Sequence, residues 1–179
     1  FIIMFGLGTL IHYLGSILLV HADRIIIEKF LTKSEVAIYS IGYSFGMILM
    51  LIPTAVGQSF SPWFYKTLSS GKHDDIFIVI NKITGLSLIL IMLFISLSGL
   101  IVENLFDERY FGSISTINII ASSVYFILVY TLIANFQFYF EKKLLISLST
   151  ILAAIINIVL NCIFVPKYGF ISASFTSLF

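Results

Sequence analysis

Residues 21–45 read HADRIIIEKFLTKSEVAIYSIGYSF, and they place an Asp-Arg pair and a helix start signal between two long apolar runs. The run before Asp23 is long enough to cross a bilayer, which takes about 20 apolar residues. A charge pair at such a position is costly. Thr32 and Glu35 fit a capping box, in which a hydroxyl and a carboxylate each bond a free backbone N–H group. We therefore expect one spanning helix to end near Phe30 and the next to begin at the capping box.

The composition predicts a membrane protein. The 179 residues are 59% hydrophobic, 16% aromatic and only 11% charged, with a mean hydropathy of +1.09. A water-soluble domain of this length does not present so much apolar surface to water. A net charge of +1 gives no field that would hold nucleic acid. The single cysteine, Cys162, excludes an internal disulfide and a cysteine metal cluster.

Apolar runs of membrane-crossing length recur along the chain, which predicts an all-α fold, a polytopic transmembrane helical bundle. We expect a single transmembrane domain over 1–179. The chain starts without methionine and stops within an apolar run, so we expect it to be truncated at both ends. An amphipathic elbow is predicted at 76–82, after Asp74 or Asp75 as the helix N-cap. Five complete spans and the start of a sixth are expected at 1–22, 36–60, 83–102, 114–138, 144–165 and from 170 onward.

Polar residues gather on single faces of these expected helices. Tyr39, Tyr43 and Pro53 share one face of the second span, which is too polar to meet lipid throughout, so this face should look inward. Pro53 removes a backbone hydrogen bond, which predicts a kink that acts either as a gate or as a simple bend. Asn118 and Tyr125 share a face of the fourth span, where they either line an aqueous path or hold helices together.

His12 is the one histidine expected deep within a span, on a stripe of small residues. It could relay protons, or it could be neutral and bonded to a neighbouring helix or to water. The sequence has no glycine-rich phosphate loop, no zinc spacing and no convincing Ser-His-acid set. We therefore expect no enzyme, no cofactor and no metal site. Any transport would draw on an ion gradient, the membrane potential or the substrate gradient.

Two stretches resemble bacterial polysaccharide flippases. Residues 22–46, ADRIIIEKFLTKSEVAIYSIGYSFG, are similar to the segment that joins the first two helices of the second half in O-antigen and capsule translocases. These belong to the multidrug/oligosaccharidyl-lipid/polysaccharide (MOP) superfamily. Residues 157–179, NIVLNCIFVPKYGFISASFTSLF, resemble the superfamily pattern of two asparagines, an apolar run, a proline, a glycine turn and a small-residue helix. The matching positions are Asn157, Asn161, Pro166, Gly169, Ala173 and Thr176.

The resemblance implies a fold, a function and partners. The fold would be the C-terminal, MATE-like half of a multi-pass transporter of about 12 to 14 helices in the bacterial cytoplasmic (inner) membrane. The function would be translocation of a lipid-linked oligosaccharide for O-antigen, capsule or exopolysaccharide by alternating access. The partners would be that lipid-linked oligosaccharide, membrane lipids and the N-terminal half of the same chain, with no nucleic acid.

The resemblance also suggests roles for the residues near the capping box. Arg24 would contact the pyrophosphate of the substrate, because a guanidinium group matches phosphate geometry. Alternatively, Asp23 and Arg24 pair with each other at the membrane interface. Tyr39 and Tyr43 would either stack on sugar rings or pack against neighbouring helices.

Two other functions stay open. A cation-coupled multidrug or small-molecule exporter of the same superfamily would share the fold, but it needs an intramembrane carboxylate, and we expect none in the interior spans. A membrane scaffold without transport would bury its polar faces entirely in helix contacts.

The turns should alternate between the two sides of the membrane. Those at 66–75 and 138–143 would share one side, and those at 21–35, 103–113 and 166–169 the other. The lysines of the short turns favour the first side as cytoplasmic, in agreement with the resemblance. Counting the basic residues of 21–35 removes this bias.

Overall fold

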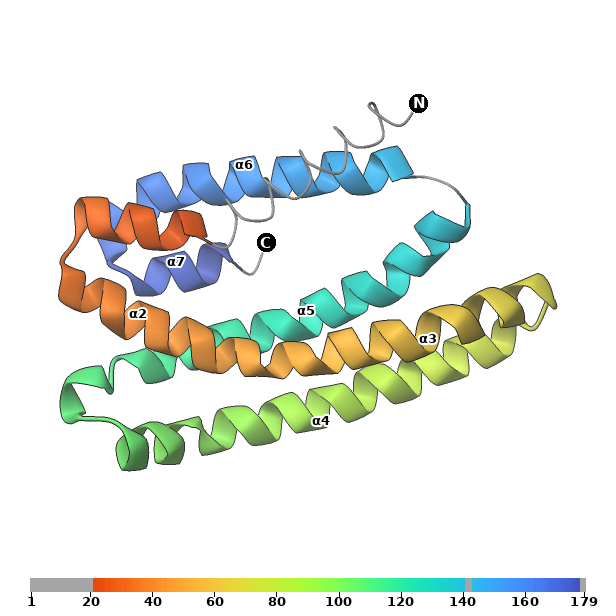
Figure 1. The fold of residues 1–179 in the computed structure, drawn as a ribbon, viewed down its shortest axis with the longest axis horizontal. Helices are drawn as coiled ribbons and strands as arrows, with labels where there is room; N and C mark the ends of the chain where they lie inside the picture. Colours follow the sequence, from red (N-terminus) through yellow and green to blue (C-terminus); the bar gives the residue numbers. More distant parts are fainter. Residues whose placement is uncertain (1–20, 141–142, 178–179) are drawn as a thin grey trace.

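The computed structural model describes residues 21–140 and 143–177, and the side chains of 143–147 lie outside that description. This part of the chain is all-α, without a strand (Figure 1). Residues 21–30 form a first helix. The elements that follow are α2 (Lys33–Gly46), the 3₁₀ helix η1 (Met47–Met50), α3 (Leu51–Ser69), α4 (His73–Leu105), the 3₁₀ helix η2 (Glu108–Tyr110), α5 (Ser113–Tyr139), α6 (Lys143–Tyr168) and α7 (Ile171–Thr176).

Four stretches of the described residues are long and apolar enough to cross a membrane. They cover residues 33–69, 73–105, 113–139 and 148–168. These four correspond to the second to fifth expected spans, so the prediction of a membrane helical bundle is confirmed. Large side chains such as Leu86, Ile89 and Met92 are exposed along α4, as expected for a surface that faces lipid. The first expected span, with His12, lies outside the described residues.

The start of α4 corrects two predictions. The predicted elbow at 76–82 is wrong, because α4 runs unbroken from His73 to Leu105. Residues 76–82 contain no proline or glycine, and Ile76 is buried, so nothing interrupts the helix there. The N-cap is Lys72, while Asp74 and Asp75 lie in the first turn, where acidic groups favourably meet the positive end of the helix dipole.

The prolines lie inside helices rather than between them. The second span was expected to end near residue 60, yet α3 continues through Pro62 to Ser69. Pro53 occupies the first turn of α3, where its missing N–H group has no intrahelical partner to lose. The irregular backbone lies just before it, in η1. Pro166 is within α6, which ends at Tyr168 before Gly169 adopts a left-handed φ of 78°.

The capping box predicted after the first helix is confirmed. The Glu35 backbone N–H donates to Thr32 Oγ1 over 3.3 Å, and the Thr32 N–H donates to Glu35 Oε2 over 2.9 Å. The two bonds satisfy backbone donors at the start of α2. The chain turns sharply at this point, so that residues 21–30 fold back beside α2 (Figure 1).

Helix α5 is the centre of the bundle. It packs against α2, α3, α4, α6 and α7. One buried apolar cluster joins residues 21–30, α2, α6 and α7 around Ile27, Tyr39 and Val165. A second joins α3, α4 and α5 around Phe64, Ile76 and Leu128. The first cluster surrounds the polar site described below.

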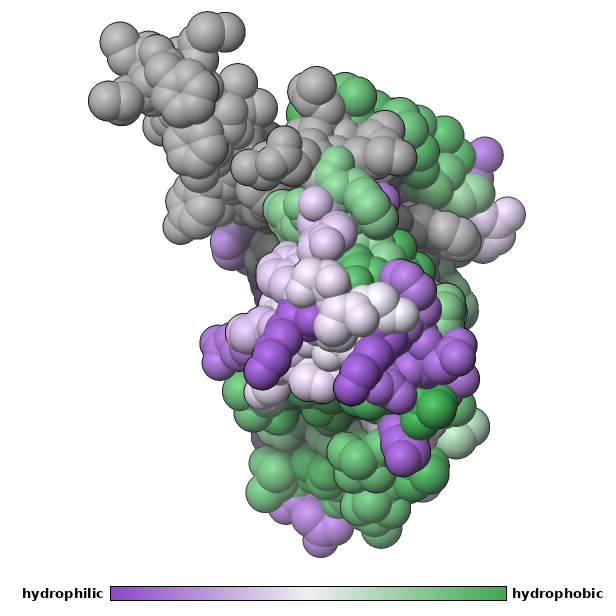
Figure 2. Space-filling view, turned by 90° about the vertical axis from the view of Figure 1, so that its right-hand side faces the viewer, coloured by the Kyte–Doolittle hydropathy of each residue, from purple (hydrophilic) through white to green (hydrophobic). Residues whose placement is uncertain are grey.

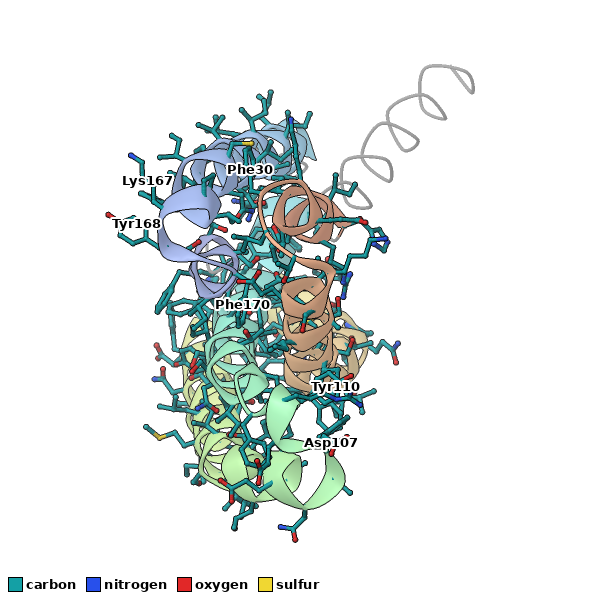
Figure 3. All side chains as sticks on the ribbon, turned by 90° about the vertical axis from the view of Figure 1, so that its left-hand side faces the viewer. Phe30, Asp107, Tyr110, Lys167, Tyr168 and Phe170 are labelled. Carbon is teal, nitrogen blue, oxygen red and sulfur yellow. The ribbon has the colours of Figure 1, made fainter. Side chains whose placement is uncertain are left out.

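The turns gather at two opposite ends, as the sequence predicts. At the left of Figure 1 lie the turn before α2, the α4–α5 connection and the α6–α7 turn. Figure 3 looks onto this end, with Phe30, Asp107, Tyr110, Lys167, Tyr168 and Phe170 labelled. The α3–α4 turn, the end of α5 and the start of α6 lie at the right. Figure 2 faces that second end, where hydrophilic surface over the α3–α4 turn, exposed from 69 to 75, separates two hydrophobic regions.

Candidate functional site

The carboxylate of Asp23 is buried in the bundle, with 1% of the residue exposed. Three donors from three other segments reach it. Tyr39 Oη in α2 donates to Oδ2 over 2.7 Å, Ser177 Oγ after α7 donates to Oδ2 over 2.8 Å, and Asn161 Nδ2 in α6 donates to Oδ1 over 2.6 Å. A buried carboxylate is tolerated only when donors replace its lost water. Asp23 therefore links four segments of the chain through its hydrogen bonds.

The network extends along one face of α6. Asn161 Nδ2 also donates to Asn157 Oδ1 over 3.1 Å, and Asn161 Oδ1 accepts from Thr176 Oγ1 over 2.6 Å. Asn157 and Asn161 meet because residues four apart share a helix face. Both asparagines are buried. Asn157 Nδ2 is buried and has no hydrogen-bond partner. We call Asp23, Tyr39, Asn157, Asn161, Thr176 and Ser177 the Asp23 cluster.

Arg24 lies beside this cluster and is partly exposed. Its Nε donates to Ser40 Oγ in α2 over 3.1 Å. Its guanidinium carbon lies 4.9 Å from the centroid of the Tyr43 ring, and the Tyr43 and Tyr39 ring centroids are 5.9 Å apart. A guanidinium group over an aromatic face is held by a cation–π attraction. Arg24 is thus held against α2 at the border of the cluster, while Asp23 points into it.

A cavity of about 440 Å³ adjoins the Asp23 cluster. It lies between the middle of α5, the middle of α6 and the segment around Thr176, and Asn157 belongs to both the cluster and the cavity wall. Its volume is within the range of about 300–1,000 Å³ that is usual for small-molecule sites. The described residues that line it carry hydroxyl groups, an amide and two aromatic rings.

The structure brings together seven of the residues singled out from the sequence: Asp23, Arg24, Tyr39, Tyr43, Asn157, Asn161 and Thr176. Asn118 lies elsewhere, where its Oδ1 accepts from Ser98 Oγ of α4 over 2.7 Å. Tyr125 contacts the neighbouring Phe126 ring. Pro53, Pro166 and Gly169 shape helix starts and ends without entering the cluster. His12 lies outside the described residues.

Sequence reasoning missed two side chains of the site. Ser177 had no assigned role, although it follows Ala173 by one helical turn and thus shares its face. Ser40 was noted only as part of the resemblance, yet it holds Arg24. The burial of Asp23 was not predicted either, although Asp23 lies outside the four candidate spans. The sequence places Asp23 at the end of an apolar run, whereas the fold buries it among three helices and the segment after α7.

Most of the polar side-chain atoms in the Asp23 cluster are oxygens. Carboxylate, amide and hydroxyl oxygens are ligand types of hard cations. Within the described residues, no three His, Cys, Asp or Glu side chains gather in a way that could hold a metal ion. Tyrosine, serine and threonine hydroxyls can both donate and accept hydrogen bonds. The hydroxyls of the cluster could therefore give up their bonds to Asp23 if its carboxylate bound a proton or a cation.

The chain is similar to a Haemophilus influenzae protein. That protein, described as "Lsg locus putative protein 1", is 25% identical over 167 residues, which cover 88% of this chain and 40% of the relative. The chain therefore spans less than half of that protein. No family model matches the sequence, and no solved structure matches it.

Proposed function

We propose that this chain is part of a transporter that moves a lipid-linked oligosaccharide across the bacterial cytoplasmic membrane by alternating access. The observation that carries the proposal is the Asp23 cluster, in which one carboxylate, two amides and three hydroxyls connect four segments of an apolar bundle. Ionisable groups inside membrane bundles are costly and are functional sites by default. The chain would form one half of the transporter, working against an N-terminal half of the same protein.

The choice of substrate rests on Arg24 and on the relative. A partly exposed guanidinium group held by Ser40 and Tyr43 suits the pyrophosphate of a lipid-linked sugar. The locus named in the relative's description is one for lipooligosaccharide and polysaccharide synthesis. The two flippase-like stretches, 22–46 and 157–179, also contribute all six residues of the Asp23 cluster. The three observations favour an anionic glycolipid over other cargo.

Transport by the full-length protein tests the proposal. The purified protein would be reconstituted into vesicles with a fluorescent lipid-linked oligosaccharide, and a membrane-impermeant reagent would report how much substrate remains outside. We expect substrate to cross only in vesicles that contain the protein. Monodisperse protein that moves no lipid-linked oligosaccharide would refute the proposal.

A second candidate, an ion-coupled exporter of small molecules, gains support from Asp23. That function requires a carboxylate inside the bundle, and Asp23 is such a group. The same vesicles separate the two candidates. An exporter would move cationic dyes against a proton or sodium gradient, whereas the proposed flippase would move the glycolipid and leave the dyes behind. A membrane scaffold would move neither.

A further inference from the structure

A groove lies between α3 and α4, on the side of the bundle away from the Asp23 cluster. Its volume is about 490 Å³, and the described residues that line it are Ala55, Val56, Ser59, Phe60, Trp63, Val79 and Ile83. None of them is charged, and all except Ser59 are apolar or aromatic. Leu86 follows Ile83 by three residues and therefore shares its face of α4, and Leu86 is 62% exposed. The groove thus opens onto the lipid-facing surface of α4, where it meets hydrocarbon chains rather than water.

The groove lies at the depth where the hydrocarbon gives way to lipid headgroups. Residues 83–102 of α4 carry no charge and are bounded by Lys82 and Glu103. At about 1.5 Å per residue, this run is about as long as the roughly 30 Å hydrocarbon core is thick. Lys82 therefore marks the headgroup boundary, and the lining residues Val79 and Ile83 lie on either side of it. Trp63 lines the same groove from α3, at the depth where tryptophan is enriched in membrane proteins.

Two lysines flank the groove, one on each helix. Lys66 follows Trp63 by three residues on α3, and Lys82 follows Val79 by three residues on α4, so each lysine shares a helix face with a residue of the wall. Both lysines are exposed, and neither ammonium group makes an ion pair with a described residue. Basic side chains beside membrane helices at this depth attract the phosphate groups of anionic lipids.

We propose that this groove binds an anionic phospholipid, with one acyl chain along Phe60 and Trp63 and the phosphate between Lys66 and Lys82. A zwitterionic lipid would fill the groove equally well, but its own positive charge would oppose the two lysines, so the lysines select a headgroup with a net negative charge. Of the two acids in the first turn of α4, only Asp75 shares the face of the groove, because it lies one helical turn before the lining residue of α4. One acid weakens the attraction of two lysines without cancelling it.

The fluorescence of Trp63 tests this proposal in the full-length protein. Trp63 is the single tryptophan of the 179 residues, and any tryptophan elsewhere in the full-length protein would be replaced by phenylalanine. The protein would be reconstituted into phosphatidylcholine vesicles with a varied fraction of a lipid that carries brominated acyl chains, because bromine quenches tryptophan fluorescence on contact. The probes are brominated phosphatidylglycerol, which is anionic, and brominated phosphatidylcholine. The two quenching curves give the binding constant of phosphatidylglycerol relative to phosphatidylcholine.

We expect this relative binding constant to be at least about five, which corresponds to one favourable lysine contact with an anionic lipid. Lys66→Gln and Lys82→Gln should each lower it, and the double variant should bring it to about one. Lys167→Gln is the matched control, because Lys167 is exposed at the other end of the bundle. It should leave the relative binding constant unchanged.

Two further variants separate charge from shape. Asp75→Asn removes the acid that shares the face of the groove, so it should raise the relative binding constant. Ser59→Phe places a ring in the groove and leaves both lysines in position. Ser59 is exposed, so the helix can carry the larger side chain, and the preference for phosphatidylglycerol should be lost because the acyl chain no longer fits.

Four results would overturn the proposal. Equal quenching by the two lipids in the parent protein would mean that the groove does not select an anionic headgroup. A preference that persists in the double lysine variant would place the selectivity elsewhere, and one that persists in Ser59→Phe would show charge attraction without a groove site. Weak quenching by both lipids would mean that another part of the full-length protein covers the groove. Lipid binding is measured here without transport, so the outcome is independent of the proposed function.

Discussion

Asp23 shows how a single charged residue can organise an apolar bundle. Its carboxylate accepts from Tyr39, Asn161 and Ser177, so every bond it makes joins residues 21–30 to a different segment. The cost of removing a carboxylate from water is offset only while those donors stay in place. Each donor should therefore contribute measurably to the stability of the whole bundle.

Tyr39→Phe should lower the free energy of unfolding by about 1.5–3 kcal/mol, because it removes a hydrogen bond to a charged group and keeps the ring. Tyr168→Phe is the matched control, since Tyr168 is 71% exposed at the end of α6. Thermal unfolding of the two purified variants in detergent, followed by size-exclusion chromatography, would give their melting temperatures. Equal melting temperatures for the two variants would contradict a stabilising role of the Tyr39–Asp23 bond.

A second prediction at the scale of the residue concerns Arg24. Arg24→Gln should reduce the initial rate of glycolipid transport at least about tenfold, as expected when a charge-assisted contact to phosphate is lost. Arg24→Lys should restore the rate only in part, because an ammonium group cannot make two parallel bonds. Arg109→Gln removes an exposed arginine from the α4–α5 connection and should transport normally. A loss of equal size in Arg109→Gln would point to a general charge effect.

At the scale of the element, glycines set the distance between α2 and α5. A Cβ on Gly42 would lie 2.6 Å from Thr116 Cβ and 2.8 Å from the Ser113 carbonyl oxygen, and one on Gly46 would lie 2.7 Å from Ile120 Cβ. These atoms belong to the backbone or to its immediate neighbours, so they cannot turn away. Small residues let membrane helices approach closely, and here they let α2 pack directly against α5.

Gly42→Ala should therefore destabilise the protein by about 1–3 kcal/mol, the usual cost of overpacking. Gly85→Ala and Gly99→Ala in α4 are controls with the same chemical change, because a Cβ at either position meets nothing within 4 Å. Those two should be neutral or slightly stabilising, by up to about 1 kcal/mol. Melting temperatures of the three variants would decide. A neutral Gly42→Ala would mean that α2 and α5 are less tightly packed than described.

At the scale of the whole molecule, the short turns at the two ends differ in their number of basic residues. The turns at 66–75 and 138–143 carry Lys66, Lys72, Lys142 and Lys143, whereas those at 103–113 and 166–169 carry Arg109 and Lys167. The short-turn lysines favour the first end as cytoplasmic. Ser70 and Glu108 are both exposed, and each would be replaced by a single cysteine. Spheroplasts would then be treated with a membrane-impermeant maleimide, before and after permeabilisation, and the two cysteines should prove to lie on opposite sides of the membrane. Glu108→Cys should react from outside, and Ser70→Cys only after permeabilisation. Labelling of both from one side would contradict a membrane-spanning α4.

The sequence predicted the helical class, the four spans that the described residues contain, the capping box at Thr32 and the arrangement of turns at two ends. Hydrophobic run length determines these features, and the membrane enforces them because unpaired backbone groups are not tolerated in hydrocarbon. The elbow at 76–82 and the end of the second span were wrong. At 76–82, the hydrophobic periodicity changes which way side chains face without breaking the helix. At the end of the second span, Pro62 is accommodated within α3.

Only the tertiary structure decided which polar residues meet. The Ser177–Asp23 bond joins residues 154 positions apart, and the Asn161–Asp23 bond joins residues 138 apart. No local pattern encodes such contacts, because they depend on how α6 and α7 fold back over residues 21–30. Asn118 and Asn157 are both amides within apolar helices. Packing gives Asn118 Oδ1 a bond from Ser98 of α4, whereas Asn157 Oδ1 accepts from Asn161 of its own helix and its Nδ2 is buried without a hydrogen-bond partner. Run length thus fixed the helices, and the contacts between helices made the site.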